Sequence, residues 1–310
     1  MPSKFLTRRV IVGVDFSQTS IAAARWVIRW LASDDELVLV HALVVPEMRG
    51  ILAVRFPLPE SLLVNAREGA ERRLREVASS LRFDRIVLEI KEGRPRDVMA
   101  QAAHDHHASL VVVGKHGESS SKRGYPGRTA DGLVRSSPVP VLLAAGLMKD
   151  NPKRLVVPLT FSSVTPHVVD WVKTLSDRFD PEIVAVHVVG SAVLSHVLSM
   201  SAVVQGNDSM SKLEIDRVFG AERDEWTRTL VEAGVPAARI RSEVVFGEVS
   251  QEVRDAVTRH GADMIVMGSH AGAIRRAFLG SAASAVLREA EVPVLVVVEP
   301  EERGAKANPG

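Results

Sequence analysis

The chain contains no cysteine at any of its 310 positions. Disulfide frameworks, thiolate chemistry and cysteine-based zinc sites are therefore excluded. The net charge is only +1, from 39 basic and 38 acidic residues, which gives no bulk electrostatic reason to expect binding to nucleic acid or to an acidic membrane. No apolar run approaches the ~20 residues of a bilayer span, and the first residues lack an apolar segment of signal-peptide length. These absences predict a cytoplasmic protein with no transmembrane segment and no nucleic-acid partner.

What the sequence does contain is an internal repeat. Residues 9–17 (RVIVGVDFS) are similar to residues 154–162 (RLVVPLTFS), and each segment is followed by a tryptophan at the same spacing, Trp26 and Trp171. Further landmarks recur in the same order: 37–41 and 183–187, Gly93 and Gly247, Gly114 and Gly268, and the closing segments 139–144 and 292–298. The length is also about twice that of a typical domain of ~100–150 residues. We expect one domain at 1–148, a second at 149–300 and a polar tail at 301–310.

Within the repeat, apolar runs alternate with helical patterns. In the first copy we predict strands at 10–14, 36–43, 85–90, 109–113 and 139–144, and helices at 18–31, 60–80, 96–107 and 129–136. The strands are continuous runs of Val, Ile and Leu, as expected where helices cover both faces of a sheet. The pattern predicts an α/β fold of two flavodoxin-like (Rossmann-like) doubly wound parallel sheets with strand order 3-2-1-4-5. In that order a crevice opens between the first strand and a later central strand.

Two segments of the first copy fall at this crevice. The first strand runs into Gly13 and Asp15, and the fourth runs into Gly114, with Gly117 and Gly127 following before a helix. Glycines let backbone N–H groups approach an anion, and a helix N-terminus adds a favourable dipole. The acid can accept a hydrogen bond from a base amino group or a ribose hydroxyl. The residues therefore indicate a site with a phosphate end and a nucleoside end, unless the glycines only provide the positive φ that turns need.

The spacing of Gly114, Gly117 and Gly127 resembles the ATP loop of the universal stress protein family. Other features of that family are the sequence VDFS at 14–17, EGRP at 92–95 and the Val-Pro-Val of each closing strand, so the resemblance extends over both copies. It implies a tandem universal stress protein that binds ATP or a related adenine nucleotide, with Mg or Mn as an accompanying ion and no resident metal. In the first copy it implies the binding residues Gly13, Asp15, Ala42, Val113, Gly114, His116, Gly117, Gly127, Arg128 and Thr129.

Neither copy matches the family pattern completely. Arg128 stands where the family has Ser or Thr after the last glycine. The second copy keeps that hydroxyl in Ser281, but it has Ala271 for the second glycine and Thr160 where the first copy has Asp15. The weaker second site would comprise Pro158, Thr160, Val188, Met267, Gly268, His270, Gly280, Ser281 and Ala282. We expect at most one good nucleotide site, in the first copy.

The resemblance implies a stress-response regulator or switch rather than an efficient catalyst. There is no Gly-Lys-Ser/Thr P-loop, and one carboxylate does not make a phosphoryl-transfer site, so we predict no catalytic residues and slow ATP hydrolysis at most. One alternative is a scaffold or sensor that binds no nucleotide and acts through protein or lipid-like contacts. Its contact could be the apolar insertion at 191–204, for which the alternatives are a lid, an oligomer contact, a membrane-peripheral helix or a helix packed over the end of the sheet. The other alternative is a slow ATPase or adenylating enzyme.

The last predictions concern the pairing of the two copies and the roles of four histidines. The closing strands of the two copies are candidate sheet edges, and the resemblance implies that they pair as an internal dimer; a further homo-oligomer and an unidentified protein partner stay open. His104 and His107, on one predicted helical face, either hold a metal or face solvent at a helix end. His41 and His187 end equivalent strands, either as packed, hydrogen-bonded residues or as catalytic bases.

Overall fold

The elements of the structure follow the alternation in the sequence. The computed structural model describes residues 9–45, 60–115, 127–146, 148, 150–190, 212–269 and 280–299. The first copy contains β1 (Arg9–Gly13), α1 (Gln18–Val27), the 3₁₀ turn η1 (Ile28–Trp30), β2 (Glu36–Leu43), α3 (Glu60–Ser80), β3 (Ile86–Glu92), α4 (Pro95–Asp105), β4 (Leu110–Gly114), α5 (Arg128–Ser136) and β5 (Val141–Ala144). The second contains β6 (Arg154–Pro158), α6 (Thr165–Phe179), β7 (Glu182–Val189), α8 (Lys212–Glu232), the 3₁₀ turn η2 (Ala237–Arg239), β8 (Ile240–Phe246), α9 (Val249–His260), β9 (Met264–Gly268), α10 (Ser281–Glu289) and β10 (Val294–Val297).

Helix α4 ends two residues earlier than the sequence pattern predicts. His107 adopts the left-handed region, with φ +49°, and therefore cannot continue the helix. The N–H of Ala108 donates to the carbonyl of Ala103 at 2.9 Å, the long backward bond that closes a helix at a left-handed residue. In α9 the equivalent position is Gly261, with φ +61°. The two copies thus end this helix by the same backbone geometry, the first without the glycine that normally provides it.

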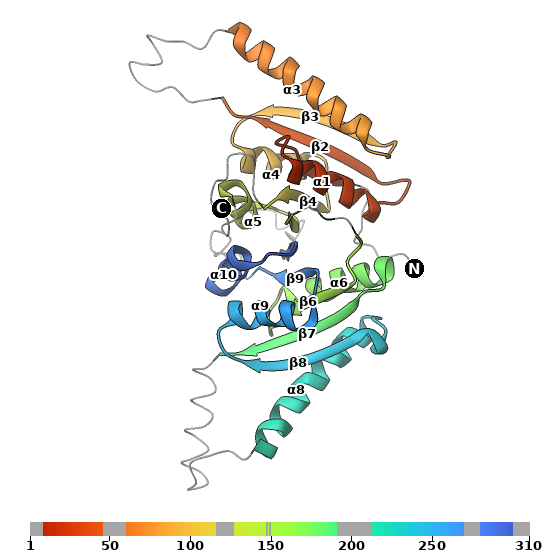
Figure 1. Cartoon of the computed structure of the whole chain (residues 1–310), viewed down its shortest axis with the longest axis vertical. Helices are drawn as coiled ribbons and strands as arrows, with labels where there is room; N and C mark the ends of the chain where they lie inside the picture. Colours follow the sequence, from red (N-terminus) through yellow and green to blue (C-terminus); the bar gives the residue numbers. More distant parts are fainter. Residues whose placement is uncertain are drawn as a thin grey trace, which may run out of the picture.

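The strands form one ten-stranded sheet in the order β3-β2-β1-β4-β5-β10-β9-β6-β7-β8 (Figure 1). All pairs within a copy are parallel, and each copy has the order 3-2-1-4-5, which confirms the predicted flavodoxin-like topology. The exception is the central pair: β5 and β10 are antiparallel, with Leu142 opposite Leu295. The copies are therefore joined through their last strands as an internal pair, and the carboxyl ends of their strands lie at opposite edges of the sheet.

Helices cover both faces of this sheet, which explains the uninterrupted apolar strands. In β1, Val10 and Val12 belong to the buried cluster on one face, which includes residues of α1, α3, α6 and α8, while Ile11 belongs to the cluster on the other face, with residues of α4, α5, α9 and α10. All three side chains are at most 1% exposed. Removing a side chain of this size from water contributes about 1.5–3 kcal/mol. Among the described residues, no helix combines the length and the apolar composition that a bilayer span requires.

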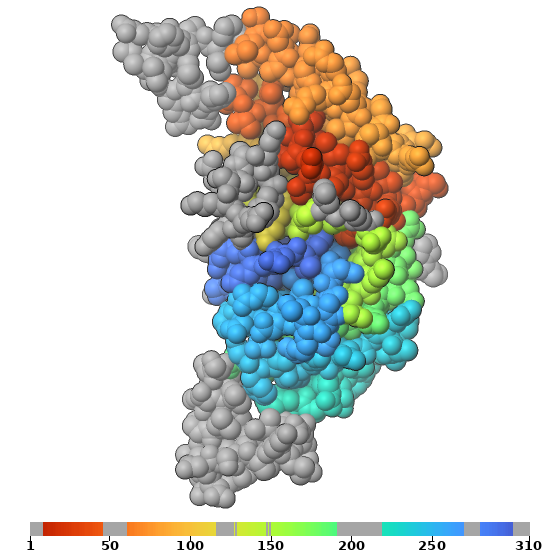
Figure 2. Space-filling model, in the orientation of Figure 1, coloured from red at the N-terminus to blue at the C-terminus, as the bar shows by residue number. Residues whose placement is uncertain are grey.

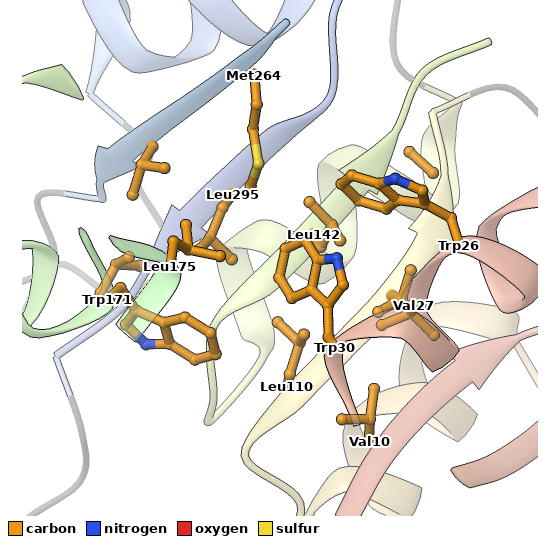
Figure 3. Close-up of a cluster of buried hydrophobic side chains, with 14 of the residues drawn as sticks. Val10, Trp26, Val27, Trp30, Leu110, Leu142, Trp171, Leu175, Met264 and Leu295 are labelled. Carbon is orange, nitrogen blue, oxygen red and sulfur yellow. The ribbon is translucent and has the colours of Figure 1, made fainter. Parts of the chain in front are cut away.

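Aromatic residues fill the junction between the copies, which meet across the middle of the molecule (Figure 2). Trp30 is 1% exposed, and its ring lies 4.9 Å from Trp26 and 5.7 Å from Phe179 of α6, measured between centroids. Figure 3 shows Trp26 and Trp30 on one side of this cluster and Trp171 with Leu175 on the other. Both repeated tryptophans are buried, as their positions in the sequence predict. The contact between Trp30 and Phe179 joins η1 of the first copy to α6 of the second.

Candidate functional site

The ends of β1 and β4 approach closely in the first copy. Val12 lies opposite Val112 in the parallel pair, so that Gly13 is next to Val113 at the carboxyl edge. A Cβ atom on Gly13 would lie 3.0 Å from both Val113 Cγ1 and Met99 Sδ. A contact this tight would require Val113 or Met99 to move by a few tenths of an ångström, so glycine is the residue that fits here without any shift. The crevice predicted between the first and fourth strands begins here.

The turn after β1 is held by its own side chains. Asp15 Oδ1 accepts a hydrogen bond from the Ser17 N–H at 3.0 Å, and Ser17 Oγ accepts one from the Ser20 N–H at 3.1 Å. Ser17 is the N-cap of α1, the role that its position before the helix predicts. Asp15 is half-buried. Its hydrogen bond to the Ser17 N–H stabilises the turn, and its position after β1 places it at the predicted crevice.

A histidine and an arginine pack around this turn. His41 Nδ1 lies 2.7 Å from the Val14 carbonyl, which can only accept, so the nitrogen donates. The His41 ring contacts Phe16, with centroids 4.5 Å apart, and the Arg73 guanidinium lies 4.1 Å from the centre of the Phe16 ring. The bond from His41 brings the end of β2, including Ala42, to the same edge as Asp15. His41 is thus packed and hydrogen-bonded, the first of the two roles considered for it.

The start of α5 lies where the sequence predicts the phosphate end of the site. The Gly127 N–H donates to the Lys115 carbonyl at 2.9 Å, which places the start of the helix beside the end of β4. Gly127 is the N-cap and has no side chain to accept the first N–H groups of the helix, which also lack intrahelical acceptors. Asp131, in the first turn, is held by Arg135 through two bonds of 3.1 Å. In contrast to α1, the start of α5 has no side-chain cap among the described residues, and the free N–H groups of such a helix start suit an anion.

The second copy repeats the strand ends with different side chains. A Cβ atom on Gly268 would overlap Val164 Cγ1, so α6 packs directly on the end of β9. Thr160 is exposed, and its hydroxyl donates to Ser162 Oγ at 3.3 Å. Helix α10 begins after Gly280 with no acidic residue in its first turn, and no described side chain caps it. This copy therefore has a comparable uncapped helix end but no carboxylate after its first strand.

A stack of aromatic rings lies over the first strand end of the second copy. His187 Nδ1 donates to the Leu159 carbonyl at 2.8 Å, as His41 does in the first copy, and His187 Nε2 lies 3.1 Å from Glu222 Oε1. Trp226 is stacked on His187 at 6.0 Å, and Phe161, 71% exposed, lies 4.6 Å from Trp226. The contacts of Glu222 and Trp226 with His187 were not predicted. Both residues belong to α8, and no sequence pattern connects that helix to the strand that carries His187.

Lys115 is a second feature that the sequence did not predict. Its side chain is 3% exposed, and its ammonium group donates to the carbonyl of Arg288 at 3.2 Å and to that of Ala290. Burial lowers the pKa of this ammonium, and the nearby Glu291 carboxylate opposes the shift. A contact across more than 170 positions leaves no local pattern by which it could be found.

Comparison with known proteins decides the family. The sequence model of the universal stress protein family matches residues 7–145 and again residues 151–298. The chain belongs to the universal stress protein family. It is 27% identical to a universal stress protein of Mycobacterium tuberculosis over 313 aligned residues, covering 93% of this chain and 96% of that protein. Universal stress protein G of Escherichia coli O157:H7 is 42% identical over 77 residues, which span 24% of this chain and about half, 54%, of that relative.

A solved structure shows the same fold for the whole tandem chain. A universal stress protein from Archaeoglobus fulgidus matches with a TM-score of 0.63 at 19% identity, over 94% of this chain and 97% of its own. Two copies of the universal stress protein fold in one chain are therefore established. The antiparallel central pair places the carboxyl ends of the two copies' parallel strands at opposite edges of the sheet.

The predicted site residues of this universal stress protein fall at those two edges as far as the structure describes them. In the first copy these are Gly13, Asp15, Ala42, Val113, Gly114, Gly127 and Thr129, with Arg128 as the first residue of α5. In the second they are Pro158, Thr160, Val188, Met267, Gly268, Gly280, Ser281 and Ala282. His116, Gly117, His270 and the insertion at 191–204 lie outside the described residues, as does the side chain of Arg128.

The sequence predicts His104 and His107 on one face of a helix. This prediction is wrong, because His107 lies beyond the end of α4. The ring centroids of the two histidines are 6.5 Å apart. His104 lies 3.5 Å from Asp105 Oδ1, and His106 Nε2 lies 2.6 Å from Glu89 Oε2. Within the described ranges, no three His, Asp or Glu side chains are grouped to hold a metal ion.

Proposed function

We propose that this universal stress protein binds ATP, or a related adenine nucleotide, at the crevice of its first copy and acts as a stress-response regulator. The observation that carries the proposal is the contrast between two helix ends at one edge. Helix α1 is capped by Ser17, whereas α5 begins with a bare glycine held beside the end of β4. Family membership makes an adenine nucleotide the class of anion that fits.

The residues divide into two groups in this proposal. The uncapped N–H groups of Arg128 and Thr129 bind phosphate oxygens, and Gly114 with Gly127 allows the backbone to approach. Asp15 and the backbone of Ala42 hold the nucleoside, which lies toward β1 and β2. Mg or Mn accompanies the phosphates rather than occupying a site of its own.

The proposed output is binding rather than turnover. Asp15 Oδ1 is engaged by the Ser17 N–H, and Asp131 is engaged by Arg135, so each carboxylate already has a task in the fold. General-base catalysis needs a carboxylate poised toward the attacking water. A regulator that changes shape or partner with nucleotide occupancy requires no such group.

The second copy is proposed as the weaker site. It retains the uncapped start of α10 with Ser281, but Thr160 replaces the acid that would hold the nucleoside. We further propose domain limits of 1–148 and 149–300 with a tail at 301–310, and a cytoplasmic location. Association of the internal pair into a larger homo-oligomer, and contact with a protein partner, belong to the same proposal of a regulator.

The test is to release and identify the ligand of freshly purified protein by mass spectrometry, and to measure thermal shifts with millimolar ATP and magnesium. Asp15→Asn is the sharpest variant, because its amide oxygen can still accept from the Ser17 N–H while the charge is lost. Thr160→Ala is the matched change in the second copy. We expect Asp15→Asn to reduce the shift and Thr160→Ala to leave it nearly unchanged. An empty pocket together with no shift in the wild-type protein would refute the proposal and favour a scaffold that binds no nucleotide.

A further inference from the structure

An aromatic stack with an exposed outer ring lies at the carboxyl edge of the second copy. Phe161 follows the end of β6 and is 71% exposed, more than any other large apolar side chain in the described part of the chain. Its ring lies 4.6 Å from that of Trp226, with 31° between the ring planes. Trp226 is 3% exposed and lies 6.0 Å from His187, with 24° between their planes. Phe161 is therefore the solvent-facing end of a stack whose middle ring is buried.

The ring beneath Phe161 and Trp226 is held by polar contacts on both of its nitrogen atoms. His187 Nδ1 donates to the Leu159 carbonyl at 2.8 Å, and His187 Nε2 lies 3.1 Å from Glu222 Oε1. The stack is thus assembled from the end of β6, from β7 and from α8. Because its rings are fixed before any ligand arrives, a planar molecule that packs on Phe161 orders few side chains.

The phenylalanine of the first copy is arranged differently. Phe16 is half-buried and contacts both the His41 ring, at 4.5 Å, and the Arg73 guanidinium, at 4.1 Å. In the second copy the residue in the place of Arg73 is Glu225, which pairs with Arg228 at 2.8 Å. A cation of the chain itself therefore packs on Phe16, and a carboxylate cannot do the same for Phe161.

The helix under the phenylalanine differs in the same way. Helices α3 and α8 both have 21 residues, and Leu74 in α3 stands where Trp226 stands in α8. Both side chains are buried, at 0% and 3% exposure. A tryptophan in this position extends the π-surface under Phe161, whereas a leucine only fills the core. The aromatic stack is consequently a property of the second copy alone.

The stack adjoins the residues that the sequence assigns to the nucleoside end of the second site. Thr160 precedes Phe161, and Val188 follows His187 in β7. Thr160 has no charge with which to replace Asp15. A nucleobase, however, has a planar π-face that an aromatic side chain can bind without any hydrogen bond to the base. The second copy therefore lacks the acid but presents an exposed ring beside its place.

We propose that Phe161 is the base-stacking residue of the second copy, which takes nucleosides and nucleotides by the face of the base rather than by a carboxylate. This inference rests on the proposed nucleotide function and deepens it, because it names the ligand class of the weaker site. Since every base has a π-face, the site should accept guanine as well as adenine.

The binding test isolates the second copy in the full chain. Asp15→Asn with Gly127→Asp disables the first site, and equilibrium dialysis with magnesium then measures ATP, GTP, adenosine and inorganic triphosphate. Phe161→Ala should weaken ATP, GTP and adenosine by about 5-fold to 150-fold and leave triphosphate unchanged. Phe161→Tyr keeps the ring and should restore binding. Val231→Ala, at another exposed apolar residue of this copy (41%), is the matched control and should change nothing.

Proton NMR of adenosine distinguishes stacking from a structural effect of the substitution. A base that lies on the Phe161 ring should show upfield shifts of its H2 and H8 protons, because these protons then lie over the face of the ring. The shifts should disappear in Phe161→Ala and return in Phe161→Tyr. A residue that only supports the fold would not produce them.

The outcomes separate this inference from the proposed function. If Phe161→Ala binds ATP and adenosine as well as its parent, or weakens triphosphate equally, stacking on Phe161 is refuted while nucleotide binding stands. If the second copy binds no nucleoside or nucleotide although the wild-type chain binds ATP, the inference is refuted and the first site stands. If the wild-type chain binds none of these ligands, both proposals are refuted.

Discussion

Replacing Gly127 by aspartate should stabilise the fold and weaken nucleotide binding at the same time. Among the described residues, the nearest atom to an added Cβ is the Lys115 carbonyl oxygen at 3.7 Å, which is an ordinary contact. The backbone of Gly127, with φ −57° and ψ 153°, is open to any residue. The aspartate would cap α5 with its own carboxylate, in the way that Ser17 caps α1. The ligand's phosphate would then meet an occupied and negatively charged site.

The two effects have different sizes. An aspartate N-cap is worth only a few tenths of a kcal/mol over glycine, with about 0.3–1 kcal/mol from the helix dipole. Repulsion between the carboxylate and one phosphate charge about 5 Å away costs roughly 0.8 to 3 kcal/mol for effective dielectric constants from 80 to 20. Since about 1.4 kcal/mol is a factor of ten, this range corresponds to a loss of affinity between about fourfold and about 100-fold.

Calorimetry with ATP and magnesium, together with urea denaturation, measures both quantities. Gly127→Asn is the neutral control, which caps the helix without the charge and should weaken binding less. Gly280→Asp is the matched change in the second copy and should leave the tighter site intact. Undiminished affinity in Gly127→Asp and in Gly280→Asp would mean that the phosphates do not lie at either helix start, and the site assignment would be wrong.

Three further predictions concern the fold. Trp30→Ala removes a side chain that is 1% exposed and should lower the free energy of unfolding by about 3–5 kcal/mol, whereas Arg72→Ala on the exposed face of α3 should change it by less than about 0.5 kcal/mol; equal urea midpoints would contradict the role given to the tryptophan cluster. Gly268→Ala should destabilise by about 1–3 kcal/mol because its Cβ overlaps Val164, while Gly280→Ala, whose Cβ meets no described atom within 4 Å, should cost less; calorimetric melting distinguishes them. Bonds from Lys91 and Gln101 lower the pKa of Asp105 from 3.8 to about 2, so its charged form adds stability above pH ~4 that is lost as the pH falls toward 2. The difference in urea midpoint between the wild-type protein and Asp105→Asn should shrink over that range, and a difference that persists at the acid end would refute the assignment.

The topology was predictable because it depends on patterns that the sequence repeats. Continuous apolar strands separated by helices leave few right-handed arrangements, and the order 3-2-1-4-5 follows in both copies. Ser17 and Gly127 are residue types that often precede a helix, so they indicate the starts of α1 and α5 from the sequence alone. The edge at which the candidate site lies was fixed by the same topology, before any side-chain contact was known.

What could not be predicted depends on contacts between distant segments. In the sequence Lys115 is a residue of the glycine-rich loop, but in the structure its side chain caps a helix of the other copy. Glu222 and Trp226 reach His187 from α8, with no periodic signal to connect them. His107 ends α4 by adopting a positive φ, which histidine seldom does. A prediction from residue types alone therefore places the end of the helix too late in the sequence.

Native mass spectrometry of the intact chain with ATP and magnesium tests the central claim most directly, because it counts bound nucleotides. The wild-type protein should bind one nucleotide tightly, Gly280→Asp should retain it, and Gly127→Asp should lose it at the same ATP concentration. A wild-type chain with no nucleotide bound, or a Gly127→Asp chain that binds as much as the wild type, would contradict a phosphate site at the start of α5.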